Sequence, residues 1–298
     1  MKQTSKTREL IVLDGMDVII RGTYHKTYDE SFDARTIPVR RDRIGVLFLN
    51  SLSTTRASHG DFAVYLAESF AEHGYPSFRL DLPGFGDSEG DPPTASPGFI
   101  DPGGYASIAS VKIRELVTRF NLSGVVIVEQ YAGGVSALYA AASCPECKGL
   151  VLLDPYFLRG TLPPENANLP LLRRWKEVAS KGLPILILKA PNRKGHGIKP
   201  RVGEFDYIRY VLELAGRGSH VVIRILDGAD HSLASRLGRA TIRRRTEQWL
   251  NACFPLINHD KDVANTLSSQ RSRDKSNKSP KASGTKTASL WKVENQHI

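Results

Sequence analysis

The sequence lacks any apolar run that approaches the roughly 20 residues a membrane-spanning helix needs. Its first nine residues are polar, and the apolar stretch that follows, Leu10–Leu13, is too short for the hydrophobic part of a secretion signal. Both absences argue against a membrane-spanning or secreted protein. We therefore expect a cytoplasmic protein without a membrane span.

Cysteine is also scarce. Three cysteines are an odd number and do not form a disulfide framework. Cys144 and Cys147 form a C-P-E-C pair, but a metal site of this type needs a second pair at matching spacing, and the sequence has none. We expect two free thiols in a loop at a helix end, and no metal or other cofactor.

Positive charge is abundant, with a formal net charge of +10. Residues 260–298 carry eight Lys or Arg and four acids, so they hold +4 of this charge and the rest of the chain holds +6. No stacking aromatics accompany the charges, which argues against specific nucleic-acid binding. We expect a disordered basic tail over 256–298 and a solvated basic face on the last helix, which contains Arg236, Arg239, Arg243, Arg244 and Arg245. The sequence gives no oligomeric state.

Between these termini, short apolar runs alternate with helical patterns. Strands are expected at 44–49, 76–80, 125–128, 150–153, 183–188 and 220–226, and helices at 62–73, 105–120, 133–141, 204–215 and 233–252. This alternation predicts an α/β domain with a mostly parallel twisted sheet and helices on both faces. An edge hairpin is expected to pair residues 17–28 with Leu10–Leu13. We divide the chain into an N-terminal segment 1–14, one domain 15–255 with a small lid at about 156–180, and the tail.

Details of one of these helices and of one turn are also predicted. Asp61 is placed to cap the helix that starts at Phe62, and Gly74 is placed to end it. The strand at 76–80 runs into the turn D-L-P-G-F-G-D-S, residues Asp81–Ser88, whose glycines permit a tight backbone path. We assign this turn a structural role.

The strand at 125–128 turns abruptly into a helix, which is the geometry of a nucleophile elbow. The usual spelling of that elbow is G-x-S-x-G, and here the five residues are E-Q-Y-A-G. Tyr131 therefore stands where a serine is expected, and Glu129 stands where the first glycine is expected.

The order of these motifs resembles the α/β-hydrolases over residues 15–255. The segment from Arg56 to Gly90, which ends in D-L-P-G-F-G-D-S-E-G, is similar to the serine-aminopeptidase-like branch, including the small hydrolases associated with exosortase systems. The G-A-D-H sequence at 228–231 follows the last strand, where the family places its histidine. The resemblance implies an α/β-hydrolase fold and a site for ester or amide chemistry.

The resemblance also implies a role for each site position. The nucleophile position falls on Tyr131, the histidine on His231, and the backbone donors of the oxyanion hole on Leu52 and Ala132. The family's acid usually follows the strand at 185–188, where this chain has no carboxylate. Asp154, at the end of the preceding strand, is the best substitute.

A tyrosine at this position does not replace a serine. Its phenol ionises near pH 10 and holds its oxygen several ångströms farther out, beyond a backbone oxyanion hole. Loss of a triad nucleophile lowers turnover by roughly a millionfold. Two nearby serines are poor substitutes, because Ser136 lies more than a turn into the helix and Ser53 lies on the oxyanion loop.

Glu129 leaves two interpretations open. It is either a neutral replacement in a site without catalytic constraint, or it pairs with Arg56 or with His231, and a pair with His231 would allow acid–base work. Accordingly, the first functional hypothesis is a non-hydrolytic homologue that binds a small acyl-type ligand or acts as a scaffold. The alternative is an active hydrolase or acyltransferase on small esters or amides that uses His231 with an unorthodox nucleophile or with Glu129. An adaptor that binds nucleic acid or a membrane surface through the tail is a third hypothesis.

Overall fold

A computed structural model describes residues 7–14, 18–27, 43–49, 54–94, 97–155, 169–190, 213, 220–226, 233 and 235–256. The chain divides into two compact units, 1–255 and 256–298, and every helix and strand below belongs to the first. Among the described residues, no helix is long and apolar enough to cross a membrane. The helix predicted at 204–215 and the tail predicted beyond Leu256 lie outside the described part.

Eight strands of the described chain form one mostly parallel sheet in the order β1-β2-β4-β3-β5-β6-β7-β8. The pairs β1–β2 and β2–β4 are antiparallel, and all other neighbours are parallel. The strands are β1 Arg8–Leu13, β2 Ile20–His25, β3 Ile44–Phe48, β4 Ser77–Leu80, β5 Gly124–Gln130, β6 Cys147–Leu153, β7 Ile185–Lys189 and β8 Val221–Ile225. The predicted edge hairpin is present as β1–β2, so part of segment 1–14 belongs to the sheet of the domain.

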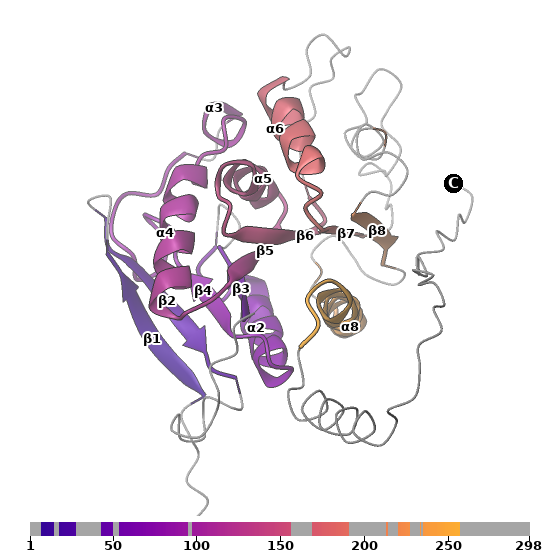
Figure 1. Cartoon of the computed structure of the whole chain (residues 1–298). Helices are drawn as coiled ribbons and strands as arrows, with labels where there is room; N and C mark the ends of the chain where they lie inside the picture. Colours follow the sequence, from indigo (N-terminus) through magenta and orange to yellow (C-terminus); the bar gives the residue numbers. More distant parts are fainter. Residues whose placement is uncertain are drawn as a thin grey trace, which may run out of the picture. The chain divides into compact units, whose positions relative to one another are not determined.

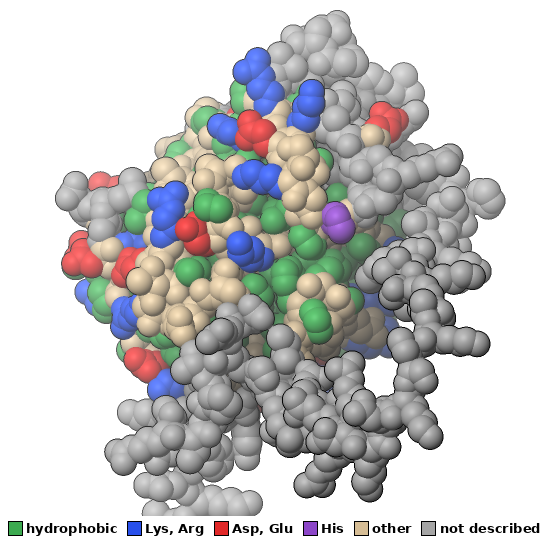
Figure 2. All heavy atoms as spheres, in the orientation of Figure 1, with side chains coloured by type: hydrophobic (Ala, Val, Ile, Leu, Met, Phe, Trp, Pro, Cys, Tyr) green, Lys and Arg blue, Asp and Glu red, His purple; other side chains and the backbone are tan. Residues whose placement is uncertain are grey.

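Helices cover both faces of the sheet (Figure 1), as predicted. Helices α4, α5 and α6 pack on one face, and α2 and α8 pack on the other. The helices are α2 Phe62–Glu72, α3 Pro97–Ile100, α4 Ala106–Arg119, α5 Gly133–Ser143, α6 Leu169–Ser180 and α8 Arg236–Cys253, with a short 3-10 turn at His59–Asp61. Acidic and basic side chains are interspersed on the surface shown in Figure 2.

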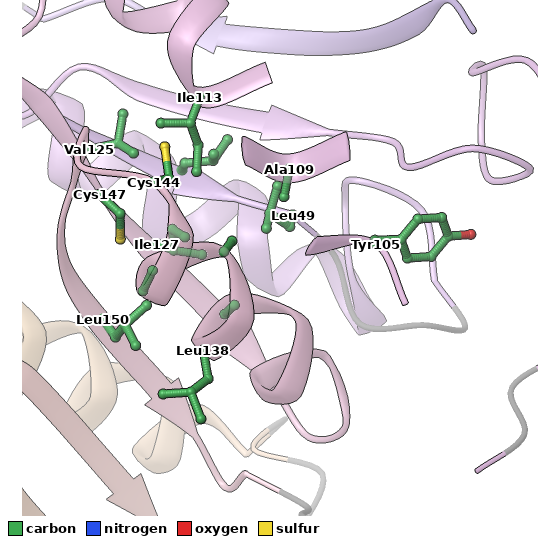
Figure 3. Packing of buried hydrophobic residues seen from close by; sticks show 14 of the residues in the cluster. Leu49, Tyr105, Ala109, Ile113, Val125, Ile127, Leu138, Cys144, Cys147 and Leu150 are labelled. Carbon is green, nitrogen blue, oxygen red and sulfur yellow. The ribbon is translucent and has the colours of Figure 1, made fainter. Parts of the chain in front are cut away.

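The alternation of side chains along each strand separates the core into two layers. In β5, Val125 and Ile127 face α4 and α5, while Val126 and Val128 face α2 and α8. Figure 3 shows the first layer, in which Cys144 and Cys147 lie among the apolar side chains. Both cysteines are free, as predicted, but Cys147 begins β6 and does not lie in the expected loop. Both are buried, and burial raises the pKa of the Cys144 thiol to about 11 and that of Cys147 to about 12.

Two local expectations for α2 have different outcomes. Gly74 follows the helix with a φ of 90°, which agrees with its predicted role as the stop. The predicted side-chain cap by Asp61 is wrong, because its carboxylate makes no capping bond and its backbone is left-handed with a φ of 58°. The capped helix is instead α8, where Ser235 Oγ accepts a hydrogen bond from Gly238 N at 3.0 Å.

The segment expected to form a lid divides into two parts. Residues 156–168 lie outside the described chain, and the rest forms α6. Leu171, Trp175 and Val178 of α6 are buried in the core layer that also contains α5. This half of the segment is therefore a crossover helix between β6 and β7, and the lid remains a prediction for 156–168.

Candidate active site

Six described residues other than glycine have positive φ values, and three of them, Ser58, Tyr131 and Asp154, have values of 61°, 51° and 44°. The other three are Asp61, Asn121 and Leu233. Ser58 lies in the segment after β3, and Tyr131 and Asp154 directly follow β5 and β6. A left-handed backbone costs a non-glycine residue roughly 1–2 kcal/mol, and such residues cluster at functional sites. The carboxyl edge of the sheet is thus the candidate site.

Tyr131 lies at the tip of the sharp turn between β5 and α5, where the sequence predicts the elbow. Its N–H donates to Leu153 O at 3.1 Å, and its carbonyl accepts from Gly134 N at 3.2 Å. The turn is therefore held on one side by β6 and on the other by the first turn of α5. The elbow backbone is formed although its central side chain is a phenol.

Glu129, at the end of β5, is buried between that strand and α5. Its Oε2 accepts a hydrogen bond from Gln130 N at 2.9 Å, and the carboxyl lies so close to Gly133 that a Cβ there would collide with it. Burial raises the pKa of Glu129 well above its usual value, which favours the neutral acid. The absent side chain of Gly133 provides the space for Glu129.

The interpretation in which Glu129 pairs with Arg56 is wrong, because Arg56 binds other acids. Its guanidinium contacts the buried carboxylate of Asp81, and Nη2 lies 2.7 Å from Asp87 Oδ2. Arg56 N also donates to Asp81 Oδ1 at 2.5 Å. Arg56 therefore joins the segment after β3 to the turn after β4 and does not reach the elbow carboxyl.

Asp81 organises that turn, in agreement with the structural role predicted for it. Besides Arg56, its Oδ2 accepts from Asp87 N at 3.1 Å, and its carbonyl accepts from Ser88 Oγ at 2.6 Å. Gly86 has a φ of 54°, and a Cβ at this position would collide with the Asp81 carboxylate. The glycine is required here by close approach as well as by conformation.

A second buried contact fixes the same segment after β3. Arg79 Nη1 donates to Arg56 O at 3.0 Å, and Arg79 Nε donates to His25 Nε2 at 2.8 Å. Burial, with Arg79 beside it, lowers the pKa of His25 to about 3, so the ring is a neutral acceptor. Ser58 Oγ donates to Gln130 Oε1 at 2.8 Å, which connects this segment to the end of β5.

Asp154, the expected substitute acid, is ion-paired. Its Oδ1 lies 3.0 Å from Lys189 Nζ at the end of β7, and both side chains are only 7% exposed. Its N–H donates to Leu188 O at 2.7 Å. The sequence reasoning missed Lys189 as a site residue, although a charged residue that ends the apolar run 185–188 was a usable signal. Any contact between Asp154 and His231 remains a prediction.

Four of the six predicted site residues, Glu129 among them, lie at the described carboxyl edge, and two lie outside the described residues. Tyr131 and Ala132 form the elbow and Asp154 follows the neighbouring strand β6, which pairs with β5. Ala132 occupies the N-cap of α5, and its N–H donates to no acceptor within the described residues. His231 and Leu52 lie outside the described part of the chain. The serine alternative Ser136 is buried in α5, where its Oγ accepts from Tyr105 N at 3.4 Å.

Comparison with known proteins gives structural neighbours only. No family model and no curated protein sequence matches the chain. An esterase from Pyrococcus furiosus is similar with a TM-score of 0.61 and 12% identity, over 83% of this chain and 91% of the esterase. A predicted CIB-like hydrolase from Thermoplasma acidophilum has a TM-score of 0.54 and 14% identity, over 82% and 98% of the two chains. Est1E from Butyrivibrio proteoclasticus, solved with ferulic acid bound, has a TM-score of 0.53 and 13% identity, over 80% and 99%. These likenesses and the sheet topology establish that the chain has the α/β-hydrolase fold.

Proposed function

We propose that this protein is a non-hydrolytic homologue of the α/β-hydrolases that binds a small acyl-type ligand or acts as a scaffold. The observation that carries the proposal is the phenol of Tyr131 on an elbow with a φ of 51°. A serine there would hold its hydroxyl beside the Ala132 N–H, whereas a phenol holds its oxygen several ångströms farther away. A carbonyl attacked by that oxygen would lie outside the oxyanion hole.

The ion pair of Asp154 supports the same conclusion. In a hydrolytic triad, an unpaired carboxylate orients the histidine and stabilises the imidazolium that forms during attack. Here the Lys189 ammonium lies 3.0 Å from Asp154 Oδ1 and offsets that negative charge. At least one oxygen of Asp154 thus serves an ion pair within the fold, a role that does not require a catalytic histidine.

The burial of Glu129 weighs against the alternative, a hydrolase or acyltransferase of small esters or amides that uses this carboxyl. The residue is 3% exposed, and its carboxyl packs against Gly133 beneath the elbow. A substrate atom would have to separate α5 from β5 to reach it. A hydrolase that uses His231 with another nucleophile remains as the alternative, and an assay of turnover tests it.

A direct assay tests whether the protein lacks hydrolytic activity. The purified chain is incubated with p-nitrophenyl acetate and, separately, with a fluorophosphonate probe that labels activated serines. We expect a release rate equal to that of buffer with heat-denatured protein, and no labelled band. Turnover or labelling that disappears in the His231→Ala variant would establish an active hydrolase and overturn the proposal.

A gain-of-function series tests whether Tyr131 is the missing element. The Tyr131→Ser variant and the Tyr131→Ser/Glu129→Gly double variant restore the residue types of the elbow, and Tyr131→Ala/Glu129→Gly is the matched control. We expect esterase activity above the control in the double variant, limited by the ion pair of Asp154. Equal activity of both double variants would mean that Tyr131 does not occupy the attacking position.

The binding half of the proposal needs its own measurement, which uses an acyl compound that cannot be hydrolysed readily. We expect butyramide to raise the unfolding midpoint of the wild-type chain in a concentration-dependent way, since a ligand that binds only the folded state stabilises it. The Tyr131→Ala variant should show a smaller rise. No rise with butyramide or its longer-chain amides would favour the scaffold over the ligand-binding protein.

A further inference from the structure

The arginines of α8 form two classes that the sequence does not separate. The helix contains five arginines and one acid, Glu247. The two inner arginines are bound within the fold. Arg239 Nη1 donates to Gly60 O at 2.7 Å, and Arg243 Nη1 donates to Glu247 Oε1 at 3.2 Å. Glu247 in turn accepts from Ser69 Oγ of α2 at 2.6 Å, so these contacts attach α8 to α2 and to the segment before it.

The other three arginines occupy exposed positions of the helix, although Arg236, seven residues before Arg243, lies on the same side as that residue. Arg236, Arg244 and Arg245 are exposed, and no ion pair joins them to any described residue. Leu237 is 63% exposed and lies seven residues before Arg244, which places both on one helical face. We call these four residues the outer face of α8. The only acid of the helix is buried and bound to Arg243, so this face contains no carboxylate.

This combination differs from an ordinary solvated helix face. Solvated faces usually mix both signs of charge, as on the surface shown in Figure 2. The outer face of α8 has one sign of charge and an exposed leucine between the arginines. Basic side chains around a projecting apolar residue are typical of helices that lie on membrane surfaces.

We propose that the outer face of α8 binds the surface of a bilayer that contains anionic phospholipids. The arginines would contact the phosphate and carboxylate groups, and Leu237 would enter the boundary between headgroups and acyl chains. Nucleic acid offers phosphates as well, but it has no apolar layer for Leu237. This inference is independent of the function proposed for the elbow, because none of its residues lies there.

Vesicle flotation with the full chain tests the proposal. We expect binding to phosphatidylcholine vesicles that contain phosphatidylserine and not to pure phosphatidylcholine vesicles. Each arginine near an anionic surface strengthens binding by about fivefold, so the Arg236→Gln/Arg244→Gln/Arg245→Gln variant should bind about a hundredfold more weakly. Raising the salt from about 0.1 M to about 1 M should have a similar effect, since the screening length falls from about 10 Å to about 3 Å.

A matched control removes the same charge elsewhere. Arg114→Gln/Arg173→Gln/Lys176→Gln changes three exposed basic residues of α4 and α6 and should bind vesicles within about twofold of the wild type. If both triple variants bind vesicles equally weakly and keep the unfolding midpoint of the wild type, net charge alone explains the loss of affinity. That result would overturn the proposal. Binding of a short fluorescent DNA duplex without binding of phosphatidylserine vesicles would overturn it in favour of nucleic acid. Leu237→Asn should weaken vesicle binding several-fold, and an undiminished affinity would contradict the role of the leucine.

Discussion

Two tight turns at the carboxyl edge of the sheet, after β4 and after β5, differ in what their side chains do. In the turn Asp81–Ser88, the central carboxylate binds Arg56 and the Asp87 amide, and Gly86 leaves it the space to do so. In the elbow Glu129–Gly133, a buried carboxyl fills the space beside Gly133 and a phenol occupies the tip. The first turn matches the residue types of the α/β-hydrolase motif, and the second does not.

The difference shows which positions the fold itself constrains. Asp81 is buried and fixes two segments of backbone, so the domain needs it with or without catalysis. At the elbow tip, the contacts of Tyr131 with Leu153 O and Gly134 N involve main-chain atoms, which any residue type supplies. The main-chain path of the elbow is therefore compatible with a tyrosine at its tip.

The largest loss of stability should come from removing the Asp81 carboxylate, which lies at the centre of the first turn. Asp81→Ala leaves the Arg56 guanidinium without its buried partner and leaves the Asp87 amide without an acceptor. Breaking a buried ion pair from one side costs about 3–5 kcal/mol. We expect the free energy of unfolding in urea to fall by that amount.

Asp87→Ala is the control for this measurement. Asp87 pairs with the same guanidinium, but its side chain is 64% exposed, so the loss should stay below about 1 kcal/mol. Similar losses in both variants would mean that the buried carboxylate does not organise the turn.

A second test concerns the space shared by Glu129 and Gly133. A methyl group at 133 would collide with the Glu129 carboxyl, so Gly133→Ala should lower the free energy of unfolding by about 2 kcal/mol. In the Glu129→Gly background, the same substitution should cost less than about 0.5 kcal/mol. A double-mutant cycle measured by urea unfolding gives the coupling, and additive effects would contradict the packing described for the elbow.

The sequence predicted much of the fold because its signals are local. The apolar run at 125–128 and the helical pattern after Gly133 located the elbow, and the motif at Asp81 located the first turn. Side-chain partners across the sheet were not predictable in the same way. Lys189 and Asp154 are 35 positions apart in the sequence and meet only because β6 and β7 are neighbours.

Two expectations failed for related reasons: the contact between Glu129 and Arg56, and the side-chain cap of α2 by Asp61. Pairing with a basic residue was one of the two interpretations of Glu129, because a charged residue at a strand end can reach a counter-ion. The missing side chain of Gly133 instead allows it to be buried as a neutral acid. Asp61 has a capping residue type, but its backbone and that of Gly60 are left-handed, whereas a capping residue usually has an extended backbone. In both cases the deciding contact comes from a neighbour whose position the sequence does not give.

The charge state of Glu129 should appear as a pH-dependent stability. Its pKa in the folded chain is raised above the ordinary value near 4.5, so above pH 4.5 the unfolded chain loses a proton that the folded chain keeps. The wild type therefore loses stability as the pH rises toward the folded pKa, by at most about 1.4 kcal/mol per pH unit.

Glu129→Gln removes this ionisation and keeps an acceptor for the Gln130 N–H. We expect the variant to equal the wild type at pH 4 and to be more stable by about 1–2 kcal/mol at pH 7, as measured by urea unfolding at both values. A stability difference that is the same at both pH values would show that Glu129 is ionised in the folded chain.

The smallest expected effect isolates the strain that remains at the elbow tip. Tyr131→Gly and Tyr131→Ala both remove the phenol, but only glycine adopts a φ of 51° without a steric penalty. At an ordinary site alanine is the more stabilising of the two by about 0.4–1 kcal/mol, because it restricts the unfolded chain. Here the order should reverse, and the glycine variant should unfold at a higher urea concentration, with a free energy about 0.5–1 kcal/mol above that of the alanine variant. If the alanine variant is instead the more stable one, residue 131 leaves the left-handed region once the ring is removed. In that case the phenol maintains the elbow, and the main-chain contacts to Leu153 and Gly134 do not.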